Sequence, residues 1–406
     1  MALPFVLSSY LRPFLDDAGR RLYDNGVTGR TERLTPREEA VVRALWDEST
    51  AESALADVVA SSSRAAVRDT LLSLYQRALV FDSHASCHAL LAHLRDAHFP
   101  KIPFIDQIEL TNRCPMRCRF CPRGVPERMQ RPTGFMEFGL FRSLLAQLHP
   151  GQAGYRPLEL HHLGESLLHP QVVDFVQCAS DHGLPTEMSV NPSLLTAELG
   201  QRLLAAGLRR LVLSLDGTDD RTLVQIRGPA ARYGKAQRNI EALLQAAAQR
   251  GAAAPKIVIQ MIALSANQHQ REEFLRRYGS LGLPTVEAYI KPLDGPDPDG
   301  AAEAAPGESL NYLCSYPFRS VVVLWDGRVV PCCRDDDARY VLGSLYEQSL
   351  SEIWHGPAAQ ELRQRHREDR FAPGHLCFDC AFSPAAFAAA QARRHPDRAA
   401  PAPLQW

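Results

Sequence analysis

Three cysteines stand close together in the chain, at Cys114, Cys118 and Cys121, with the spacing C-x3-C-x2-C. Thiolates are the usual protein ligands of iron–sulfur clusters. Three of them on one short loop can hold three irons of a [4Fe–4S] cube and leave the fourth iron open to another ligand. Zinc is the alternative, but its sites usually have paired C-x2-C halves with four ligands, or histidines in reach. Because this loop has no fourth ligand, the spacing favours a cluster with one open iron.

A second group of cysteines lies toward the C-terminus, with the spacing C-x12-G-x4-C followed by a distant C-x2-C pair. Its members are Cys314, Cys332, Cys377 and Cys380, and Cys333 stands beside one of them. Four thiolates can close a second iron–sulfur cluster or form a structural zinc ribbon, and iron and sulfide content would separate the two. Cys87 and Cys178 are isolated, and we expect both to be packed core thiols.

The elements that must position the first group alternate between strand and helix. Short apolar runs rich in β-branched residues predict strands at Gln107–Thr111, Leu158–Leu163, Thr186–Val190, Arg210–Leu215, Lys256–Leu264 and Thr285–Ile290. Amphipathic stretches between them predict helices that include Pro170–His182, Ala197–Ala206, Tyr233–Arg250 and Gln270–Ser280. This alternation indicates βαβ units and a parallel sheet. Six repeats predict an α/β fold, a partial (β/α)6 TIM-type barrel over residues 100–293, with its chemistry at the carboxyl ends of the strands.

The loop after the first of these strands, with the aromatic Phe120 before its last cysteine, resembles the signature of the radical S-adenosylmethionine (radical SAM) superfamily. The resemblance implies that the amino and carboxylate groups of SAM chelate the open iron. It implies that one electron from the cluster, delivered by a donor such as flavodoxin or ferredoxin, cleaves SAM. The resulting 5′-deoxyadenosyl radical would abstract a substrate hydrogen, so the cofactors would supply the difficult chemistry.

Other positions resemble motifs of the same family, each after a predicted strand. Gly164 and Glu165 resemble the Gly-Gly-Glu motif that meets the SAM amino group, although Leu163 replaces its first glycine. Ser189 and Asn191 resemble ribose-contacting positions. The positions that resemble the family's Ser-x-Asp-Gly run and its SAM-carboxylate arginine are Ser214, Asp216 and Arg227. Bidentate geometry suits arginine for a carboxylate. Glu165 also reads as an ordinary acid at a helix start.

The second cysteine group resembles the auxiliary-cluster modules called SPASM and twitch domains, here over residues 310–383. No cysteine follows Cys380, so the resemblance implies one auxiliary [4Fe–4S] cluster, closed by four thiolates, and two clusters in all. A twitch-type module occurs in a dehydrogenase of an aminocyclitol antibiotic pathway. Cys333 is either a packed thiol or a catalytic donor of a hydrogen atom to a substrate radical. Cys178 is a poorer candidate donor, because its predicted helix belongs to the outer ring.

Residues 1–82 predict a small winged-helix-like domain. Thr35, Pro36 and the acids after them predict a helix N-terminus, a second helix is expected near Glu52–Ala60, and a third spans Ala65–Ala78. The module resembles those that bind leader peptides during the maturation of ribosomally made peptides. Such modules take an extended peptide along a strand edge. The alternative is an extension that serves dimerisation or packing.

Composition limits the remaining possibilities. The chain has 406 residues and a formal net charge of -1, which gives no indication of nucleic-acid binding. No apolar run is long enough to cross a membrane, and Met1 to Phe14 lacks the features of a signal peptide. Clustered cysteines without an export signal favour the reducing cytoplasm. Residues 294–309 are a linker by composition, and 384–406 form an Ala-, Arg- and Pro-rich tail.

Three classes of function are consistent with these patterns. The first is oxidation, crosslinking or epimerisation of a precursor peptide, indicated by residues 1–82. The second is a dehydrogenase, dehydratase or epimerase of a sugar or aminocyclitol, indicated by the single closed auxiliary cluster. The third is a non-catalytic metal-binding interaction protein. Lys291 and Gln260 are candidates for the barrel mouth, and strand alternation points only one of His161 and His162 inward.

Overall fold

The computed structural model describes residues 6–7, 11–15, 21–25, 30–46, 64–77, 79–81, 99–125, 129–148, 157–251, 254–279, 281–293, 314, 316–368, 371–378 and 380. The chain divides into two compact units. The first comprises residues 1–99, 308–315 and 368–406, and the second comprises residues 100–307 and 316–367. All six strands predicted for the barrel belong to the second unit.

The described residues of the first unit form a three-stranded antiparallel sheet, a separate strand pair and two helices. The sheet has the order β2 (Leu11–Leu15), β3 (Arg21–Asn25), β4 (Arg30–Glu32). A separate antiparallel pair joins β1 (Val6–Leu7) to β5 (Val80–Phe81). The helices are α1 (Pro36–Trp46) and α3 (Arg64–Gln76). The helix expected at Glu52–Ala60 lies outside the described residues, and the winged-helix character of the module stays a prediction.

Helix α1 begins at a capping box. The Thr35 hydroxyl accepts a hydrogen bond from the Glu38 amide at 3.3 Å, and the Glu38 carboxylate accepts one from the Thr35 amide at 2.8 Å. The other Glu38 oxygen accepts hydrogen bonds from Ser73 at 3.1 Å and Arg77 at 2.7 Å, which joins α1 to α3. Burial by itself raises the pKa of Glu38, but the Thr35 amide and the Arg77 guanidinium hold that pKa below its ordinary value.

Replacing Thr35 by alanine is expected to destabilise α1 by about 1 kcal/mol, because the cap is lost. Amide exchange over residues 36–46 of the full chain should then be roughly fivefold faster, whereas Thr35→Ser keeps the hydroxyl and should exchange like the wild type. Because the pKa of Glu38 is held below its ordinary value of 4.5, the carboxylate contributes its stabilisation above pH 4.5 and loses it as the pH falls through the lower pKa of the folded state. Equal exchange in Thr35→Ala and wild type would contradict this account of the helix start.

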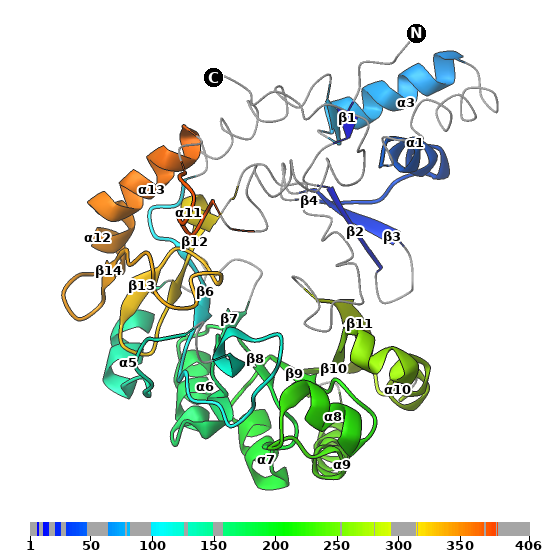
Figure 1. Ribbon diagram of the computed structural model, residues 1–406. Coiled ribbons are helices and arrows are strands. Elements are labelled where there is room, and N and C mark those ends of the chain that lie inside the picture. The colour runs from blue at the N-terminus through cyan, green and yellow to red at the C-terminus, as the bar shows by residue number, and fades with distance from the viewer. Residues whose placement is uncertain are drawn as a thin grey trace. The chain divides into compact units, whose positions relative to one another are not determined.

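The second unit is built on a nine-stranded sheet with the order β11-β10-β9-β8-β7-β6-β12-β13-β14. Six neighbouring strands run parallel: β6 (Phe104–Ile108), β7 (Leu158–Glu159), β8 (Thr186–Val190), β9 (Arg210–Ser214), β10 (Lys256–Ala263) and β11 (Val286–Pro292). The helices between them are α5 (Phe138–Leu145), α6 (Val172–Asp181), α7 (Ala197–Ala205), α8 (Asp220–Arg227), α9 (Tyr233–Arg250) and α10 (Arg271–Tyr278). Figure 1 shows α6, α7 and α9 outside the curved row of strands. The predicted α/β fold with a parallel sheet is confirmed.

The strands alternate between an apolar and a polar face. In β8, Met188 and Val190 are 0% and 2% exposed, whereas Glu187 and Ser189 point to the opposite face. Since helices cover the outside of the sheet (Figure 1), the polar residues belong to its concave face. A barrel filled only for stability would carry branched aliphatic residues there, so the polar interior indicates a site.

Strand β12 (Ser320–Val323) extends the barrel sheet by pairing in parallel with β6. It continues antiparallel into β13 (Arg328–Val330) and β14 (Gly343–Ser344). The flanking helices are α11 (Tyr316–Arg319), α12 (Leu350–His355) and α13 (Pro357–Arg367). The sequence predicts a separate module at 310–383, whereas residues 316–367 share one compact unit with the barrel. Among the helices of the described residues, none combines the length and apolar character needed to cross a bilayer.

Candidate active site at the carboxyl ends of the strands

The cysteine loop begins earlier than the sequence indicates. The strand predicted at Gln107–Thr111 ends at Ile108. Beyond it, the Leu110 carbonyl accepts a hydrogen bond from the Met136 amide at 2.8 Å, and Thr111 forms an isolated bridge with Phe135. The β-branched pattern continues to Thr111, but these contacts with residues 135–136 draw the chain out of the sheet.

The loop is fastened to the end of α8. The Arg117 amide donates to the Arg227 carbonyl at 2.9 Å, and the Arg119 amide donates to the Ile226 carbonyl at 3.1 Å. The Cys121 amide then donates to the Cys118 carbonyl at 3.1 Å and closes the turn. A short 3-10 helix, η1 (Pro122–Gly124), follows. Backbone contacts therefore fix the loop independently of its thiols.

Gly164 brings the segment after β7 against the same loop. The next residue, Glu165, donates its amide to the Arg113 carbonyl at 2.8 Å. A Cβ added at Gly164 would lie 1.8 Å from the Thr111 carbonyl oxygen and 2.8 Å from Asn112 Cα. Only glycine permits this approach. The structure thus places Gly164 where it sets the distance between two loops, a role that its motif does not reveal.

The three thiols of the loop are partly or fully buried. Cys118 is 8% exposed, and Cys114 and Cys121 are intermediate. Burial, together with the charge on neighbouring thiolates, raises the pKa of Cys114 to about 12 and that of Cys118 to about 11. Burial also raises the pKa of Cys121. The thiols are therefore within electrostatic reach of one another and protonated at neutral pH, so metal binding must displace protons.

The donor set fits a cluster with an open iron. Among the described residues, no three His, Cys, Asp or Glu side chains are arranged as a formed metal site. The fit therefore depends on chemistry: three thiols share one loop, and the buried Asn191 is linked to that loop through Glu165. Asn191 is 3% exposed, and its Nδ2 has no hydrogen-bond partner among the described residues. A buried donor without a partner is costly, which is consistent with a ligand that completes the site.

Asp216 and Arg227 form a buried ion pair beside the loop. Arg227 Nε and Nη2 lie 2.7 and 2.6 Å from Asp216 Oδ2, and its Nη1 lies 3.9 Å from Cys118 Sγ. Asp216 is 0% exposed, and its other oxygen accepts a hydrogen bond from the Ile262 amide at 2.8 Å. Burial disfavours the guanidinium charge, but Asp216 and the Cys118 thiolate hold the pKa of Arg227 above its ordinary value. The Phe120 ring centroid lies 5.7 Å from Arg227 Cζ.

Glu165 connects the cysteine loop to the end of β8. Its Oε2 accepts a hydrogen bond from the Asn191 amide at 2.8 Å, and its Oε1 accepts one from the Leu167 amide at 3.2 Å. The second contact caps the 3-10 helix η3 (Ser166–Leu168). Burial raises the pKa of Glu165 to about 7, although both amides and Arg227 oppose the shift. The carboxylate also raises the pKa of Cys114, and the Glu165 amide is hydrogen-bonded to the carbonyl of Arg113, the residue before that cysteine.

Further polar side chains line the concave face of the sheet. Ser189 Oγ and Ser214 Oγ lie 3.2 Å apart, and the Ser189 amide donates to His161 Nδ1 at 3.2 Å. Arg210 Nη1 contacts Glu187 Oε1 at 2.5 Å. These residues come from neighbouring strands and the loop after β7, so the structure brings together the predicted Ser189, Asn191, Ser214 and Asp216 along one rim.

The other polar candidates are His161 and His162, which follow β7, and Gln260 and Lys291, which lie on β10 and β11. His162 Nδ1 lies 2.8 Å from Gln107 Oε1, and burial lowers the pKa values of His161 and His162 to about 4. Both imidazoles are therefore neutral at pH 7. Gln260, 7% exposed, accepts a hydrogen bond from the Tyr289 hydroxyl at 2.9 Å. Lys291 pairs in register with Ile262 on the neighbouring strand.

The second cysteine group is divided between the two units. Cys332 and Cys333 belong to the second unit, and Cys314, Cys377 and Cys380 belong to the first. Cys333 packs against the apolar cluster of Val322, Leu324 and Val330, and its Sγ lies 3.9 Å from the Tyr316 hydroxyl. Burial raises the pKa of Cys333, and the carboxylates of Asp106 and Glu159 raise it further. Cys333 therefore packs on an apolar cluster and is within electrostatic reach of acidic side chains of β6 and β7.

Sequence analysis does not identify two residues that hold parts of the site, Asn267 and Arg131. Asn267 holds the Asp216 segment, because its Nδ2 donates to the carbonyls of Asp216 and Ile262 at 3.0 and 2.8 Å. Arg131 forms a bidentate pair with Glu109, directly before the cysteine loop. No local pattern marks Asn267 or Arg131, since their partners lie far away in the sequence.

Two domain models match this chain. The model described as the radical SAM superfamily matches residues 108–286, from the end of β6 to the start of β11. The model described as an iron–sulfur cluster-binding domain, SPASM, matches residues 314–381. The first range contains the three-cysteine loop, and the second contains all five cysteines of the C-terminal group.

Known proteins of several kinds are similar to the chain. The tungsten-containing aldehyde ferredoxin oxidoreductase cofactor-modifying protein of Pyrococcus furiosus is 24% identical in an alignment 289 positions long, which covers 61% of this chain and 79% of that protein. The S-adenosyl-L-methionine-dependent 2-deoxy-scyllo-inosamine dehydrogenase of Niallia circulans is 23% identical over 277 residues, which are 68% of this chain and 91% of that protein. The structure of Streptococcus suis SuiB bound to precursor peptide SuiA aligns with a TM-score of 0.51 at 13% identity, over 93% of each chain. The last likeness concerns the fold.

These matches explain why three thiols and a polar rim meet at the carboxyl ends of the strands. The radical SAM domain implies S-adenosylmethionine and a [4Fe–4S] cluster, and the SPASM domain implies auxiliary iron–sulfur. The chain is therefore an iron–sulfur enzyme of the radical SAM superfamily with a C-terminal SPASM domain.

Proposed function

We propose that this enzyme modifies a ribosomally made precursor peptide by oxidation, crosslinking or epimerisation. The observation that carries the proposal is the strand-and-helix module before the barrel. The fold likeness to SuiB, a protein solved with its precursor peptide, spans 93% of this chain and so includes much of that module. Within the described residues, β2 and β4 are the outer strands of their sheet. An extended peptide can add to such an edge through backbone hydrogen bonds.

The residues of the barrel rim are assigned to the cofactors as follows. When bound, the cluster supplies the electron that splits SAM, and SAM supplies the radical that removes a hydrogen atom from the substrate. Cys114, Cys118 and Cys121 hold the cluster. Glu165, close to Cys114, is charged once an ammonium group pairs with it, because such a partner lowers its raised pKa.

The other rim residues hold the rest of SAM. Two nitrogens of Arg227, Nε and Nη2, contact Asp216, and the third, Nη1, lies next to Cys118. This third nitrogen is suited to donate to the SAM carboxylate. Ser189 and Asn191 would contact the ribose, and such a ligand would satisfy the Asn191 Nδ2 donor, which has no hydrogen-bond partner among the described residues. The remaining contacts along the rim come from Phe120, Gly164, Ser214 and Asp216.

Cys314, Cys332, Cys377 and Cys380 would hold one auxiliary [4Fe–4S] cluster, and four thiolates would leave no iron open to substrate. Such a cluster would supply an acceptor for the electron that remains on a substrate radical; with a proton released to solvent, the net change would be a two-electron oxidation. A flavodoxin or ferredoxin in a reducing cytoplasm supplies the electrons for SAM cleavage.

The alternative is oxidation of a small polar molecule such as an aminocyclitol. It is favoured by the polar interior of the barrel and by the similarity to the inosamine dehydrogenase, which extends over 91% of that protein. The interior carries charges of both signs, because Glu187 pairs with Arg210 at 2.5 Å and Lys291 stands on β11. A hydroxylated amine would be well solvated there.

Reconstituted full-length enzyme, reduced with dithionite, distinguishes the two substrates. The probes are synthetic peptides encoded beside this gene and 2-deoxy-scyllo-inosamine. Peptide modification predicts that one of the peptides slows amide exchange over residues 11–32 and increases deoxyadenosine formation, and that the inosamine does neither. Stimulation by the inosamine alone would replace the peptide proposal. A triple Cys114→Ala, Cys118→Ala, Cys121→Ala variant is the control that forms no deoxyadenosine.

Cys333 is proposed to donate a hydrogen atom if the reaction is an epimerisation. In D2O, the wild-type product should then carry one deuterium, and Cys333→Ala should form no deuterated product. Cys178→Ala is the matched control, because that thiol lies on α6 with its Sγ 3.9 Å from His182 Nδ1. Unchanged deuterium uptake in Cys333→Ala, measured by mass spectrometry, would show that Cys333 is a packed thiol.

A further inference from the structure

Residues 129–136, the bridging segment, are fastened to the start of the cysteine loop. Thr111 Oγ1 donates to the Gly134 carbonyl at 2.5 Å. Asn112 makes two contacts: its Nδ2 donates to the Pro132 carbonyl at 2.8 Å, and its Oδ1 accepts a hydrogen bond from the Gly134 amide at 3.0 Å. Asn112 precedes Cys114 by two positions, so these hydrogen bonds hold the bridging segment to the residues that lead into the cysteine loop.

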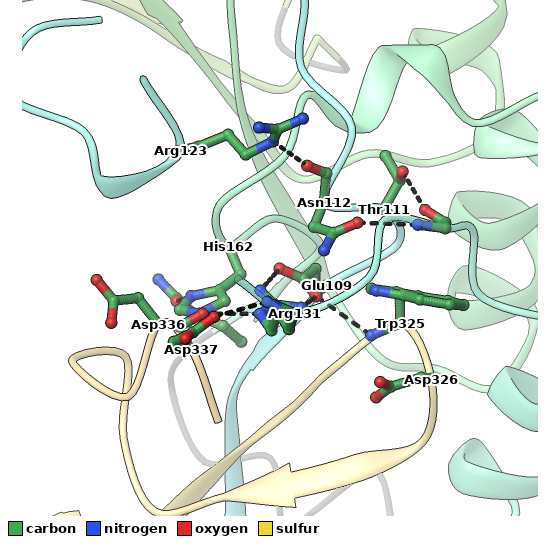
Figure 2. A network of polar contacts seen from close by, with 12 residues as sticks. Glu109, Thr111, Asn112, Arg123, Arg131, His162, Trp325, Asp326, Asp336 and Asp337 are labelled. Atoms are coloured by element: carbon green, nitrogen blue, oxygen red, sulfur yellow. Dashed lines mark hydrogen bonds and ion pairs between the residues drawn. The ribbon is translucent and has the colours of Figure 1, made fainter. Parts of the chain in front are cut away.

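The other side of the bridging segment holds the residues that follow Cys332. Asp337 Oδ1 accepts hydrogen bonds from the amides of Gln130 and Arg131 at 2.7 and 2.9 Å. Arg131 Nε donates to the Asp336 carbonyl at 2.7 Å. Figure 2 shows Asp336 and Asp337 beside Arg131, with Glu109 on its other side. One arginine therefore contacts both the barrel and the C-terminal segment.

The segment after Cys332 is itself closed by hydrogen bonds. The Asp335 amide donates to the Cys332 carbonyl at 3.2 Å. The Asp335 carboxylate, in a residue that is 0% exposed, accepts hydrogen bonds from the amides of Arg339 and Tyr340 at 2.6 and 2.8 Å. Because this turn is held together, a contact at Asp336 or Asp337 also positions Cys332.

A buried ion pair lies at the centre of these contacts (Figure 2). Arg131 Nη1 and Nη2 donate to the two oxygens of Glu109 at 2.6 and 2.5 Å, and the side chains are 2% and 0% exposed. A buried pair costs desolvation and is a weak source of stability compared with packed apolar groups. Its two parallel hydrogen bonds do, however, fix the orientation of the Arg131 guanidinium relative to the Glu109 carboxylate. This favours a positioning role for the pair.

Trp325, in the turn between β12 and β13, provides a second attachment. Its amide donates to Glu109 Oε2 at 3.3 Å, and its indole Nε1 donates to the Pro132 carbonyl at 3.3 Å. The ring lies so close to Gly134 that an added Cβ would come within 2.2 Å of it. The hairpin that leads to Cys332 is therefore pressed against the bridging segment.

We propose that Arg131 is a positioning residue that fixes the turn of Cys332 relative to the loop of Cys114, and so controls how far a cluster bound at Cys332 lies from one bound at Cys114. Through Glu109 and the bridging segment it is bound to the loop of Cys114, and through Asp336 and Asp337 it is bound to the turn of Cys332. The inference rests on the proposed assignment of Cys332 as an auxiliary ligand. Electron transfer falls steeply with distance, so this placement would affect how readily an auxiliary cluster held at Cys332 takes an electron from a substrate radical formed beside the loop of Cys114.

The double variant Glu109→Gln/Arg131→Met tests this without leaving a single charge buried. The full-length enzyme is reconstituted and reduced, with no substrate added. Wild-type iron content is expected, together with a changed dipolar coupling between the two reduced clusters in pulsed electron paramagnetic resonance. Amide exchange over residues 332–340 should be about tenfold faster, the factor that corresponds to about 1.4 kcal/mol.

Arg328→Met is the matched control. It removes the 2.7 Å ion pair to Asp326 in the same hairpin, and among the described residues the Arg328 guanidinium is bonded to Asp326 and not to the bridging segment. It should leave the coupling and the exchange unchanged. Wild-type coupling and wild-type exchange in the double variant would overturn the inference. If the double variant does not fold, Asp337→Ala, which removes the acceptor for two amides, is judged by the same two measurements.

The same measurements separate this inference from the assignment of the auxiliary ligands. A Cys332→Ala variant that keeps its full iron content would refute the ligand assignment, and with it the claim about cluster separation. The exchange of residues 332–340 in the double variant would still show whether Arg131 holds that turn. Faster exchange together with unchanged dipolar coupling would refute control of the separation while leaving the ligand assignment intact.

Discussion

Gly164→Ala is expected to lower deoxyadenosine formation by about 100-fold, the order of effect of a displacement near 1 Å in a catalytic site. The added Cβ would lie 1.8 Å from the Thr111 carbonyl oxygen and 2.6 Å from its carbonyl carbon. Both are backbone atoms, so no flexible side chain can move aside. The cysteine loop or the segment after β7 must shift, and the hydrogen bond from the Glu165 amide to Arg113 is strained first. Product analysis after reduction with dithionite measures the loss.

The control for this substitution is Gly139→Ala. Gly139 stands in α5 with nothing within 4 Å of its added Cβ, so alanine should be neutral or stabilise the helix by about 0.5–1 kcal/mol. The free energy of unfolding of Gly164→Ala should fall by about 1–3 kcal/mol, as for other overpacked sites. A Gly164→Ala enzyme with wild-type SAM cleavage would mean that the loop tolerates displacement, and that Gly164 does not set its position.

Much of the barrel could be predicted because its signals are local. The strands at 186–190 and 210–214 are short buried runs whose neighbours are strongly amphipathic helices, and both agree with the sequence within one residue. The sequence extends the first strand wrongly to Thr111. Nothing in Leu110 or Thr111 reveals that these residues pair with residues 135–136 and leave the sheet. Helix α8 was not predicted, although Asp219 caps it through a 2.7 Å hydrogen bond from the Thr222 amide. Its apolar stripe is short.

In the candidate site, too, features with a local sequence signal could be predicted, whereas contacts between distant residues could not. Cys114, Cys118 and Cys121 could be identified because ligand spacing is a local property. Asp216 and Arg227 were each predicted to lie in the site, but their mutual contact was not, since the pairing depends on how α8 folds back over the loop. The role of β12 as an extension of the barrel sheet was missed for a related reason. An apolar strand shows that it will be buried, but not which neighbour it will join.

Arg227→Met is expected to destabilise the protein by about 3–5 kcal/mol and to abolish SAM cleavage, because it leaves the Asp216 carboxylate buried without its partner. Asp216 is 0% exposed, so water cannot replace the guanidinium. The double variant Asp216→Asn/Arg227→Met removes both charges and should recover most of the lost stability. It should not recover SAM cleavage if the guanidinium also serves the cofactor beside Cys118. The comparison therefore separates the structural from the functional part of one arginine.

Two further variants sharpen the test. Arg227→Lys keeps a positive charge but cannot reproduce the contacts of Nε and Nη2 with Asp216 Oδ2 while also keeping a donor 3.9 Å from Cys118 Sγ. It should retain more stability than Arg227→Met but little activity. Arg365→Met breaks an exposed pair with Glu361 and should change neither measurement. Thermal unfolding and deoxyadenosine yield are measured for each variant. Full SAM cleavage in the double variant would limit Arg227 to holding Asp216, and would remove it from the residues that bind SAM.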